Sequence, residues 1–302
     1  MNNDDDVINL YCLHVSNHIL RNRSIIIKNN QRIKKNSEKG DFCEIRDQGF
    51  TRPQVLIVLP MRNAACRVVN VLLDLLASDS NFIVRNKKRF FEDFHEKVDH
   101  AGEKPADYNF LFDGNKDDCF LFGISLRRKS LTLYANCYKS DIIIASPLGI
   151  RTATARKADG SFKADYDFLS SIEILVLDLS DVYLMQNWAH VKILFECVNQ
   201  LPKETRETDF SRIKHYFLNN LATKYRQTLI FSRFITPEIN NLFNRVDNYA
   251  GKIKLIPHYP EGSICHVVNR VQQIFRRFSC EDHTCLSDQR FSLFINEAFI
   301  YF

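Results

Sequence analysis

Ile174-Leu175-Val176-Leu177-Asp178-Leu179-Ser180-Asp181 is the stretch that decides the fold. Its uninterrupted apolar run predicts a β-strand that is buried on both faces, as in a parallel sheet covered by helices above and below. Asp178 would then lie at the carboxyl end of this strand, where open α/β sheets bind their ligands. In nucleotide-hydrolysing enzymes of this build, such an aspartate holds Mg²⁺, and a catalytic glutamate often follows it. Here the following residue is Leu179.

Three other apolar runs have the same character. They cover residues 55–59 before Pro60, residues 141–146 before Pro147, and residues 228–232. Apolar residues at helical spacing lie between these runs and on either side of them, at 7–28, 61–77, 181–199 and from 236 onward. Alternating buried strands and amphipathic helices predict a parallel α/β sheet with right-handed crossovers and helices on both faces. The strand ends at Pro60, Pro147, Asp178 and Ser232 should therefore share one edge of the sheet.

Weaker patterns predict the remaining elements. Residues 78–120 resemble an insertion between core elements, and residues 257–262, with two prolines and a glycine, are the best linker candidate. We therefore divide the chain into a first domain over 1–256 and a linker with the start of a second domain over 257–302. The other predicted elements are strands at 119–126, 252–256 and 271–275, and helices at 127–139, 209–224 and 288–299.

Composition narrows the class of protein. The 302 residues carry a net charge of +5, which permits an acidic partner such as RNA without requiring one. Nine scattered cysteines suit a reducing compartment with free thiols. The acidic start lacks the pattern of a signal peptide, and no apolar run approaches the ~20 residues of a membrane helix. These features predict a soluble intracellular protein without a membrane partner, and they are compatible with the nucleus.

Two other patterns have competing interpretations. The basic residues between 21 and 39 form either a solvated helix end and loop or a patch that contacts phosphates. Cys280, His283 and Cys285 are three possible metal ligands without a fourth nearby, and His14 and His18 lack the glutamate of a zinc hydrolase. The sequence therefore predicts no metal site.

The four strand ends resemble motifs of the DEAD-box RNA helicases, in the same order. Residues 59–64 resemble the P-T-R-E-L motif, residues 146–151 the T-P-G-R motif, residues 176–181 the V-L-D-E-A-D motif, and residues 228–234 the S-A-T motif. The resemblance implies a RecA-like fold, in which five residues at these ends are candidates for RNA contact: Pro60, Arg62, Pro147, Gly149 and Arg151. It assigns five others to degenerate helicase motifs: Asp178, Leu179, Asp181, Ser232 and Arg233.

A more specific resemblance rests on six stretches: residues 46–53, 145–151, 168–173, 185–188, 225–232 and 248–252. They are similar to the digestive organ expansion factor family, helicase-like nucleolar proteins associated with U3 small nucleolar RNA. The similarity covers about residues 9 to 302. It implies a nucleolar component of the small-subunit processome that acts in early pre-ribosomal RNA cleavage. The implied partners are pre-rRNA, components of the U3 small nucleolar ribonucleoprotein and other processome proteins, and residues 257–302 would begin a second RecA-like domain.

The residues also argue against ATP hydrolysis. A phosphate-binding loop needs the pattern G-x-x-x-x-G-K-[ST], but only Gly251 precedes a lysine, and no glycine lies between Met1 and Lys39. Leu179 replaces the catalytic carboxylate, and Arg233-Phe234 replaces the small Ala-Thr pair of the S-A-T motif. These losses predict a pseudo-helicase with no catalytic residue and no cofactor.

Three functions remain open from the sequence. The first is a non-catalytic scaffold in ribosome biogenesis that holds RNA or neighbouring proteins. The second is a divergent ATP-dependent RNA helicase. The third is a protein-interaction module without RNA contact. Independently of these functions, the plainer interpretation of Asp178 and Asp181 is a strand-end polar group and a helix N-cap rather than a metal site, and Arg62 and Arg151 are either ordinary surface arginines or RNA contacts.

Overall fold

The computed structural model describes residues 3–39, 44–77, 81–96, 104–154, 165–204, 206, 208–256, 274–280 and 282–298. The chain divides into two units, residues 1–252 and residues 253–302. The first unit contains all of the strands in the described part of the chain.

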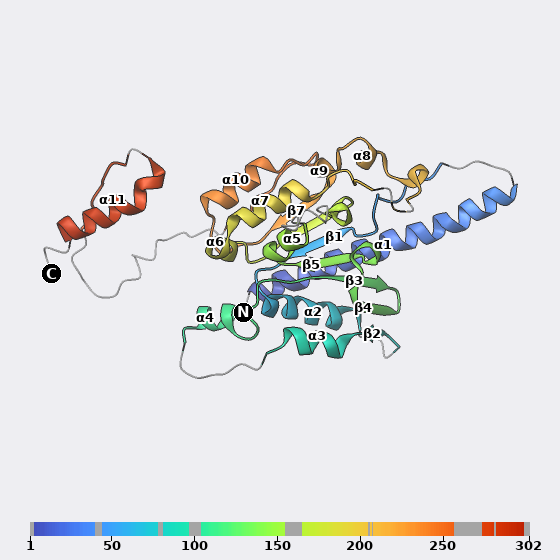
Figure 1. Cartoon of the computed structure of the whole chain (residues 1–302), viewed down its shortest axis with the longest axis horizontal. Coiled ribbons are helices and arrows are strands. Elements are labelled where there is room, and N and C mark those ends of the chain that lie inside the picture. Colours follow the sequence, from blue (N-terminus) through green and yellow to red (C-terminus); the bar gives the residue numbers. More distant parts are fainter. Residues whose placement is uncertain are drawn as a thin grey trace, which may run out of the picture. The chain divides into compact units, whose positions relative to one another are not determined.

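A seven-stranded sheet in the order β2-β4-β3-β5-β1-β6-β7 forms the centre of the first unit (Figure 1). The pairings β5–β1, β1–β6 and β6–β7 are parallel, and every residue of β1, β5 and β6 is buried. The predicted α/β architecture and its four main strands are confirmed. The strands are β1 (Val55–Val58), β2 (Ile83–Arg85), β3 (Leu121–Arg127), β4 (Ser130–Ala135), β5 (Ile142–Ala145), β6 (Ile174–Leu177) and β7 (Gln227–Ile230).

One strand, β3, runs against the direction of the other six strands of the sheet. β3 pairs antiparallel with both β4 and β5, whereas β2 pairs parallel with β4. The helix predicted over residues 127–139 is therefore wrong, because β4 occupies its centre as the second arm of a hairpin. The alternation of Leu131 and Leu133 with polar neighbours, which buries the two leucines, is the strand period that the helical prediction overlooked.

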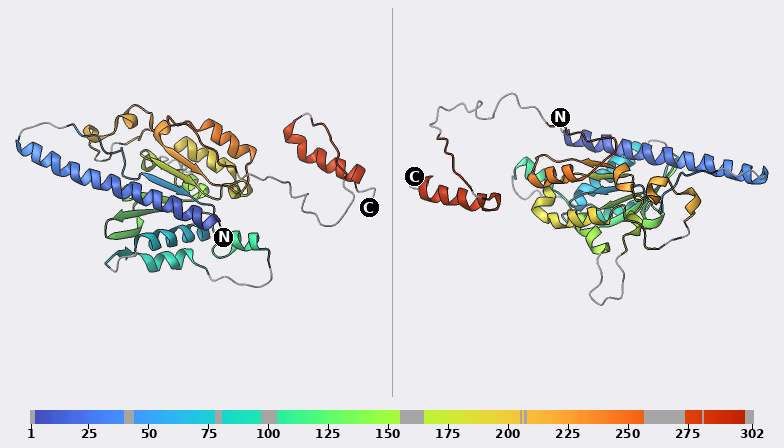
Figure 2. Two further views of the ribbon diagram at one scale, coloured as in Figure 1. Left: turned by 180° about the vertical axis from the view of Figure 1, so that it is seen from behind. Right: turned by 90° about the horizontal axis from the view of Figure 1, so that it is seen from above.

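Helices cover both faces of this sheet (Figures 1 and 2). On one face, α1 (Asn3–Lys39), α2 (Arg62–Leu76) and α3 (Lys87–Phe94) bury a cluster with β1, β3, β4 and β5. On the other face, α5 (Pro147–Thr154), α7 (Trp188–Cys197) and α10 (Pro237–Arg245) pack against the alternate residues of β1, β5 and β6. Because successive strand residues point to opposite faces, each central strand contributes to both cores.

Helix α1 is longer than the predicted 7–28. Ile8, Tyr11, Val15 and Ile19 form its buried stripe, and its C-terminal half projects beyond the sheet (Figure 1). The basic residues between 21 and 39 therefore lie on a helix rather than partly in a loop. Most of them are exposed.

A buried ion pair holds the chain that follows α1. The guanidinium of Arg212 donates to the Asp47 carboxylate at 2.7, 2.8 and 3.1 Å, and Asn29 of α1 donates to the same carboxylate at 2.9 Å. This cluster joins α1 to two segments that are far apart in the sequence.

Two of the predicted helices are divided into shorter helices in the structure. The helix expected at 181–199 divides at Asn187 into α6 (Val182–Gln186) and α7, because the Asn187 side chain caps α7 by accepting from the Ala189 N–H at 3.0 Å. The helix expected at 209–224 is reduced to α8 (His215–Leu218) and α9 (Ala222–Tyr225), with a left-handed Asn220 between them. The predicted insertion at 78–120 contributes β2, core residues of α3 and the helix α4 (Ala106–Phe112).

Where the first unit ends and the second begins, the strand predicted at 252–256 is wrong, because these residues have no strand pairing and are exposed. The expected linker at 257–262 and residues 271–273 lie outside the described residues, and 274–275 form no strand. The predicted C-terminal helix is confirmed as α11 (Leu286–Leu293), continued by a π-helical turn (Phe294–Ala298). A second RecA-like domain starting here stays a prediction.

Over the described residues, none of the helices combines the length and the apolar character needed to cross a membrane.

Candidate functional site

The ends of β1, β5, β6 and β7 lie along one edge of the sheet, because these four strands run parallel. We call it the carboxyl edge and define it as residues 60–63, 146–151, 178–181 and 232–233. It contains all ten residues that the helicase resemblance singles out. Some side chains along this edge make contacts within the protein, whereas others are exposed to solvent.

A tyrosine on α1 donates a hydrogen bond to the Asp178 carboxylate. The Tyr11 hydroxyl donates to Asp178 Oδ2 at 2.9 Å, in a buried contact, and the Leu179 N–H donates to Oδ1 at 2.8 Å. Burial, followed by the charge of Asp178, raises the pKa of Tyr11 far above its ordinary value, so that the phenol keeps its proton. Both carboxylate oxygens therefore accept hydrogen bonds from the chain itself.

Leu179 adopts a backbone conformation that is rare for its residue type, with φ of +54°. Its side chain is partly buried against the core beneath α1 and α2. The residue in the position of the helicase glutamate thus contributes apolar packing. It supplies no group that could orient an attacking water.

Asp181 holds the loop that follows β7. Its Oδ1 accepts from the Ser232 hydroxyl and from the Arg233 N–H, both at 3.3 Å. The expectation that the Asp181 side chain caps a helix is wrong, because it makes no capping hydrogen bond to α6 and instead joins the ends of β6 and β7.

A segment from the predicted insertion lies at the carboxyl edge. We call residues 105–118 the covering segment; it includes α4, which lies beside the N-terminal end of α1 (Figures 1 and 2). The Asn63 side chain donates to the carbonyl groups of Leu111 and Asp113 at 2.8 and 2.9 Å. The guanidinium groups of Arg67 and Arg233 both lie against the Phe110 ring, 4.3 and 4.4 Å from its centre.

Arg62 is bound by the same surroundings. Its guanidinium forms an ion pair with Asp117 at 2.7 Å, donates to the Asp93 carbonyl at 3.1 Å and lies 5.2 Å from the centre of the Phe94 ring. A phosphate at this position would have to compete with these contacts. Arg62 is therefore a weaker candidate for RNA contact than the sequence suggests.

The turn around Pro147 is held by a helix cap and by close packing. Ser146 Oγ accepts from the Gly149 N–H at 2.9 Å, and Pro147 occupies the first position of α5, where no N–H is needed. A Cβ on Gly149 would lie only 2.0 Å from the Phe120 carbonyl oxygen. The glycine is thus required for the close approach of α5 to the start of β3, which explains the residue without an RNA contact.

Arg151 differs from Arg62 because its side chain is exposed. Its guanidinium lies 3.4 Å from His190 Nδ1. Burial and then the Arg151 charge lower the pKa of His190, which keeps that imidazole neutral near pH 7 and leaves the positive charge on Arg151. Arg151 is the cation of the candidate set that is best placed to meet a phosphate.

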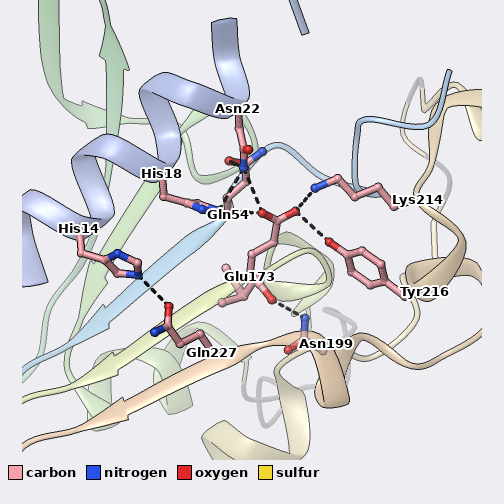
Figure 3. Close-up of polar contacts among 10 residues, drawn as sticks. His14, His18, Asn22, Gln54, Glu173, Asn199, Lys214, Tyr216 and Gln227 are labelled. Atoms are coloured by element: carbon pink, nitrogen blue, oxygen red, sulfur yellow. Dashed lines mark hydrogen bonds and ion pairs between the residues drawn. The ribbon is translucent and has the colours of Figure 1, made fainter. Parts of the chain in front are cut away.

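At the opposite, amino edge of the sheet, a buried carboxylate gathers ligands from distant segments. Figure 3 shows Glu173, just before β6, between His18 and Asn22 of α1 and the side chains of Lys214 and Tyr216. His18 and Asn22 contact Oε2 at 2.7 and 3.1 Å, while Lys214 and Tyr216 donate to Oε1 at 2.5 and 3.1 Å. We call these five residues the Glu173 cluster.

The Glu173 cluster fixes the charge of its carboxylate. Burial raises the pKa of Glu173, but the hydrogen bonds and charges of His18 and Lys214 outweigh it and lower the pKa from 4.5 to about 2. Since both oxygens are satisfied by the protein, the cluster joins α1, the start of β6 and the N-terminal end of α8. Sequence reasoning missed it, because partners as far apart as residues 18 and 173 leave no local pattern.

In the part of the chain that the structure describes, no three histidine, cysteine or acidic side chains are grouped so that they could hold a metal ion.

Comparison with known proteins identifies the family of this chain. Residues 1–253 match the model of the UTP25, NTP hydrolase-like domain. The chain belongs to the UTP25 family. The resemblance to the digestive organ expansion factor family is thereby confirmed, because the two names denote one family, and the RecA-like α/β fold class is confirmed with it.

Curated relatives carry the same family name. The chain is 42% identical over 306 residues to the U3 small nucleolar RNA-associated protein 25 homolog of Homo sapiens, covering 98% of the chain and 40% of that protein. It is 40% identical to U3 small nucleolar RNA-associated protein 25 of Sclerotinia sclerotiorum, covering 97% of the chain and 40% of that protein. The chain therefore spans about two fifths of the length of the curated relatives it matches.

Among solved structures, a DEAD box protein from the hyperthermophile Methanococcus jannaschii is 15% identical, with a TM-score of 0.29 over 67% of this chain and 36% of that one.

Proposed function

We propose that this UTP25-family chain is a non-catalytic, helicase-like scaffold of the small-subunit processome, and that it acts in pre-18S rRNA processing in the nucleolus. The printed names of the relatives, which associate them with U3 small nucleolar RNA, support this assignment. Its partners in this proposal are pre-rRNA, components of the U3 ribonucleoprotein and other processome proteins.

One observation supports the absence of catalysis most directly. The aspartate that would hold Mg²⁺ accepts hydrogen bonds from Tyr11 and from Leu179, and Leu179 stands where a catalytic glutamate would be needed. The 302 residues also contain no G-x-x-x-x-G-K motif to hold a nucleotide phosphate. The proposal is therefore that the carboxyl edge has lost its ATP chemistry.

The retained turn around Pro147 supports RNA contact at the same edge. Arg151 is exposed on the first turns of α5, and arginine side chains are frequent donors to RNA phosphates. Pro60, Arg62, Pro147 and Gly149 shape this surface in the proposal, with Arg151 as its main phosphate contact.

Arg151→Glu tests this contact. We expect the variant to bind a single-stranded RNA of mixed sequence about tenfold more weakly and to reduce the salt dependence of binding by about one phosphate contact. Fluorescence anisotropy at several salt concentrations measures both quantities.

The matched control is Arg128→Glu, which makes the same charge change at an exposed position in the turn between β3 and β4. It should alter the affinity less than twofold. Equal losses in the two variants would show that only net charge matters. Unchanged binding in Arg151→Glu would instead favour a protein-interaction module without RNA contact at this edge.

A further inference from the structure

Three tyrosines form a continuous stack at the amino edge of the sheet. The ring centres of Tyr216 and Tyr225 are 4.7 Å apart with 15° between the planes, and those of Tyr225 and Tyr249 are 4.8 Å apart with 33° between the planes. We call Tyr216, Tyr225 and Tyr249 the tyrosine ladder. It lies at the start of β7, so it is at the opposite end of that strand from Ser232 and the carboxyl edge.

The ladder is anchored at its inner end. Tyr216 is the member that belongs to the Glu173 cluster, and its hydroxyl donates to Glu173 at 3.1 Å (Figure 3). Burial, followed by the Glu173 charge, raises the pKa of Tyr216 above its ordinary range, so this donor keeps its proton. The orientation of the first ring is therefore fixed by the core.

The outer end is positioned by backbone contacts. The Tyr249 N–H donates to the Lys224 carbonyl at 3.1 Å, and the neighbouring Asn248 side chain donates to the Arg226 carbonyl at 2.9 Å. These bonds hold the Tyr249 segment beside α9 before any ligand arrives. A binding surface that is ordered in advance avoids part of the entropy cost of association.

Exposure increases outward along the ladder. Tyr225 is 45% exposed and Tyr249 is 73% exposed, although Tyr216 at the base is mostly covered. A ring that served only the core would not need two further rings stacked outward into solvent. The last ring thus presents a flat aromatic surface to the surroundings.

The local charge favours a nucleic acid as the ligand. Within three residues of the three tyrosines the sequence has four lysine and arginine residues and one acidic residue, Asp247. Lys214 is paired with Glu173 and Arg226 is buried, while Lys224 beside Tyr225 and Lys252 near Tyr249 are exposed. A cationic peptide side chain that stacked on Tyr249 would meet this positive excess, whereas an RNA backbone would be attracted by it. Stacking of bases on aromatic side chains is the usual way in which proteins hold single-stranded RNA.

We propose that the tyrosine ladder is a second RNA-contact surface, on which an unpaired base of single-stranded RNA stacks against Tyr249. This inference rests on the proposed function only in taking RNA as the partner of the chain. It concerns a different edge of the sheet and different chemistry, because stacking replaces a charge contact.

Tyr249→Ala in the full chain tests the ladder, with a fluorescein-labelled RNA of twelve adenosines as the probe. We expect about tenfold weaker binding by anisotropy, since loss of one base–aromatic stack has an effect of this order. Tyr249→Phe should bind within twofold of the original chain, because the ring is kept. The salt dependence should be unchanged in Tyr249→Ala, in contrast to Arg151→Glu.

The two variants distinguish failure of the tyrosine ladder as an RNA site from failure of RNA contact at the carboxyl edge. If Tyr249→Ala binds the probe normally while Arg151→Glu is weakened, the ladder is not an RNA site and the proposed function stands. If Tyr249→Ala is weakened and Arg151→Glu is not, the ladder stands and contact at the carboxyl edge fails. Normal RNA binding by Tyr249→Ala together with loss of a processome protein from co-purification would overturn the RNA assignment in favour of a protein partner.

Discussion

Gly149→Ala is expected to lower the free energy of unfolding by about 3 kcal/mol or more. The added methyl group would lie 2.0 Å from the Phe120 carbonyl oxygen and 2.7 Å from its carbonyl carbon. That backbone cannot retreat easily, because the same carbonyl accepts from the Ser146 N–H at 3.0 Å and Leu121 pairs with Ala145 in the sheet. Relief of the clash would require α5 to separate from β3.

Urea denaturation followed by circular dichroism measures this loss. The control is Thr152→Ala, which removes an exposed hydroxyl from the same helix and should change the free energy of unfolding by less than about 0.5 kcal/mol. A Gly149→Ala protein of normal stability that bound RNA poorly would contradict the packing role and return Gly149 to the RNA contacts.

Glu173→Gln is the second substitution with a large expected effect. The change keeps the size of the side chain but removes the charge that His18 and Lys214 contact inside the protein. From a pKa of about 2 in the folded state and 4.5 ordinarily, we expect a loss of about 3 kcal/mol in the free energy of unfolding at pH 7. The side chain of Glu173 is only 10% exposed, so solvent screens this interaction little.

The pH dependence has a definite sign. Because folding lowers the pKa of Glu173, its contribution to stability is fully present above about pH 4.5 and is lost as the pH falls toward about 2. The unfolding free energies of the original chain and of Glu173→Gln should therefore differ at pH 7 and converge at low pH.

Glu44→Gln is the matched control, because Glu44 is paired with Arg46 but its side chain is 56% exposed. An exposed ion pair of this kind is worth less than about 1 kcal/mol. Two parallel curves for Glu173→Gln and the original chain, separated equally at pH 7 and at pH 3, would show that the carboxylate charge is not the source of the stability.

The buried strands themselves could be predicted because their sequences are apolar on both faces. Each of β1, β5 and β6 is an unbroken run of aliphatic residues, and a proline or aspartate follows closely. Such runs are unfavourable at a surface, so their burial between two layers of helices follows from solvent exclusion. The ends of these strands, and hence the carboxyl edge, follow from the same signal.

The covering segment and the contact between Tyr11 and Asp178 could not be predicted in this way. Tyr11 belongs to an apolar helical stripe, and nothing in that stripe indicates a hydrogen bond to a residue 167 positions away. The covering segment is polar and irregular in sequence, and its position depends on single contacts such as Asn63 with Leu111. Local patterns specify which residues are buried, but tertiary contacts decide which polar groups meet.

The tyrosine ladder at the amino edge could not be predicted from the sequence either. Tyr216, Tyr225 and Tyr249 come from separate segments with no shared period. Their stacking depends on the broken helices α8 and α9, where a single longer helix was predicted.

RNA-stimulated ATP hydrolysis by the purified chain, with an active DEAD-box helicase as the positive control, tests the central claim most directly. We expect no turnover above background with Mg²⁺-ATP, in the presence or absence of single-stranded RNA. Hydrolysis that RNA stimulates and that Asp178→Asn abolishes would contradict the account and establish a divergent helicase.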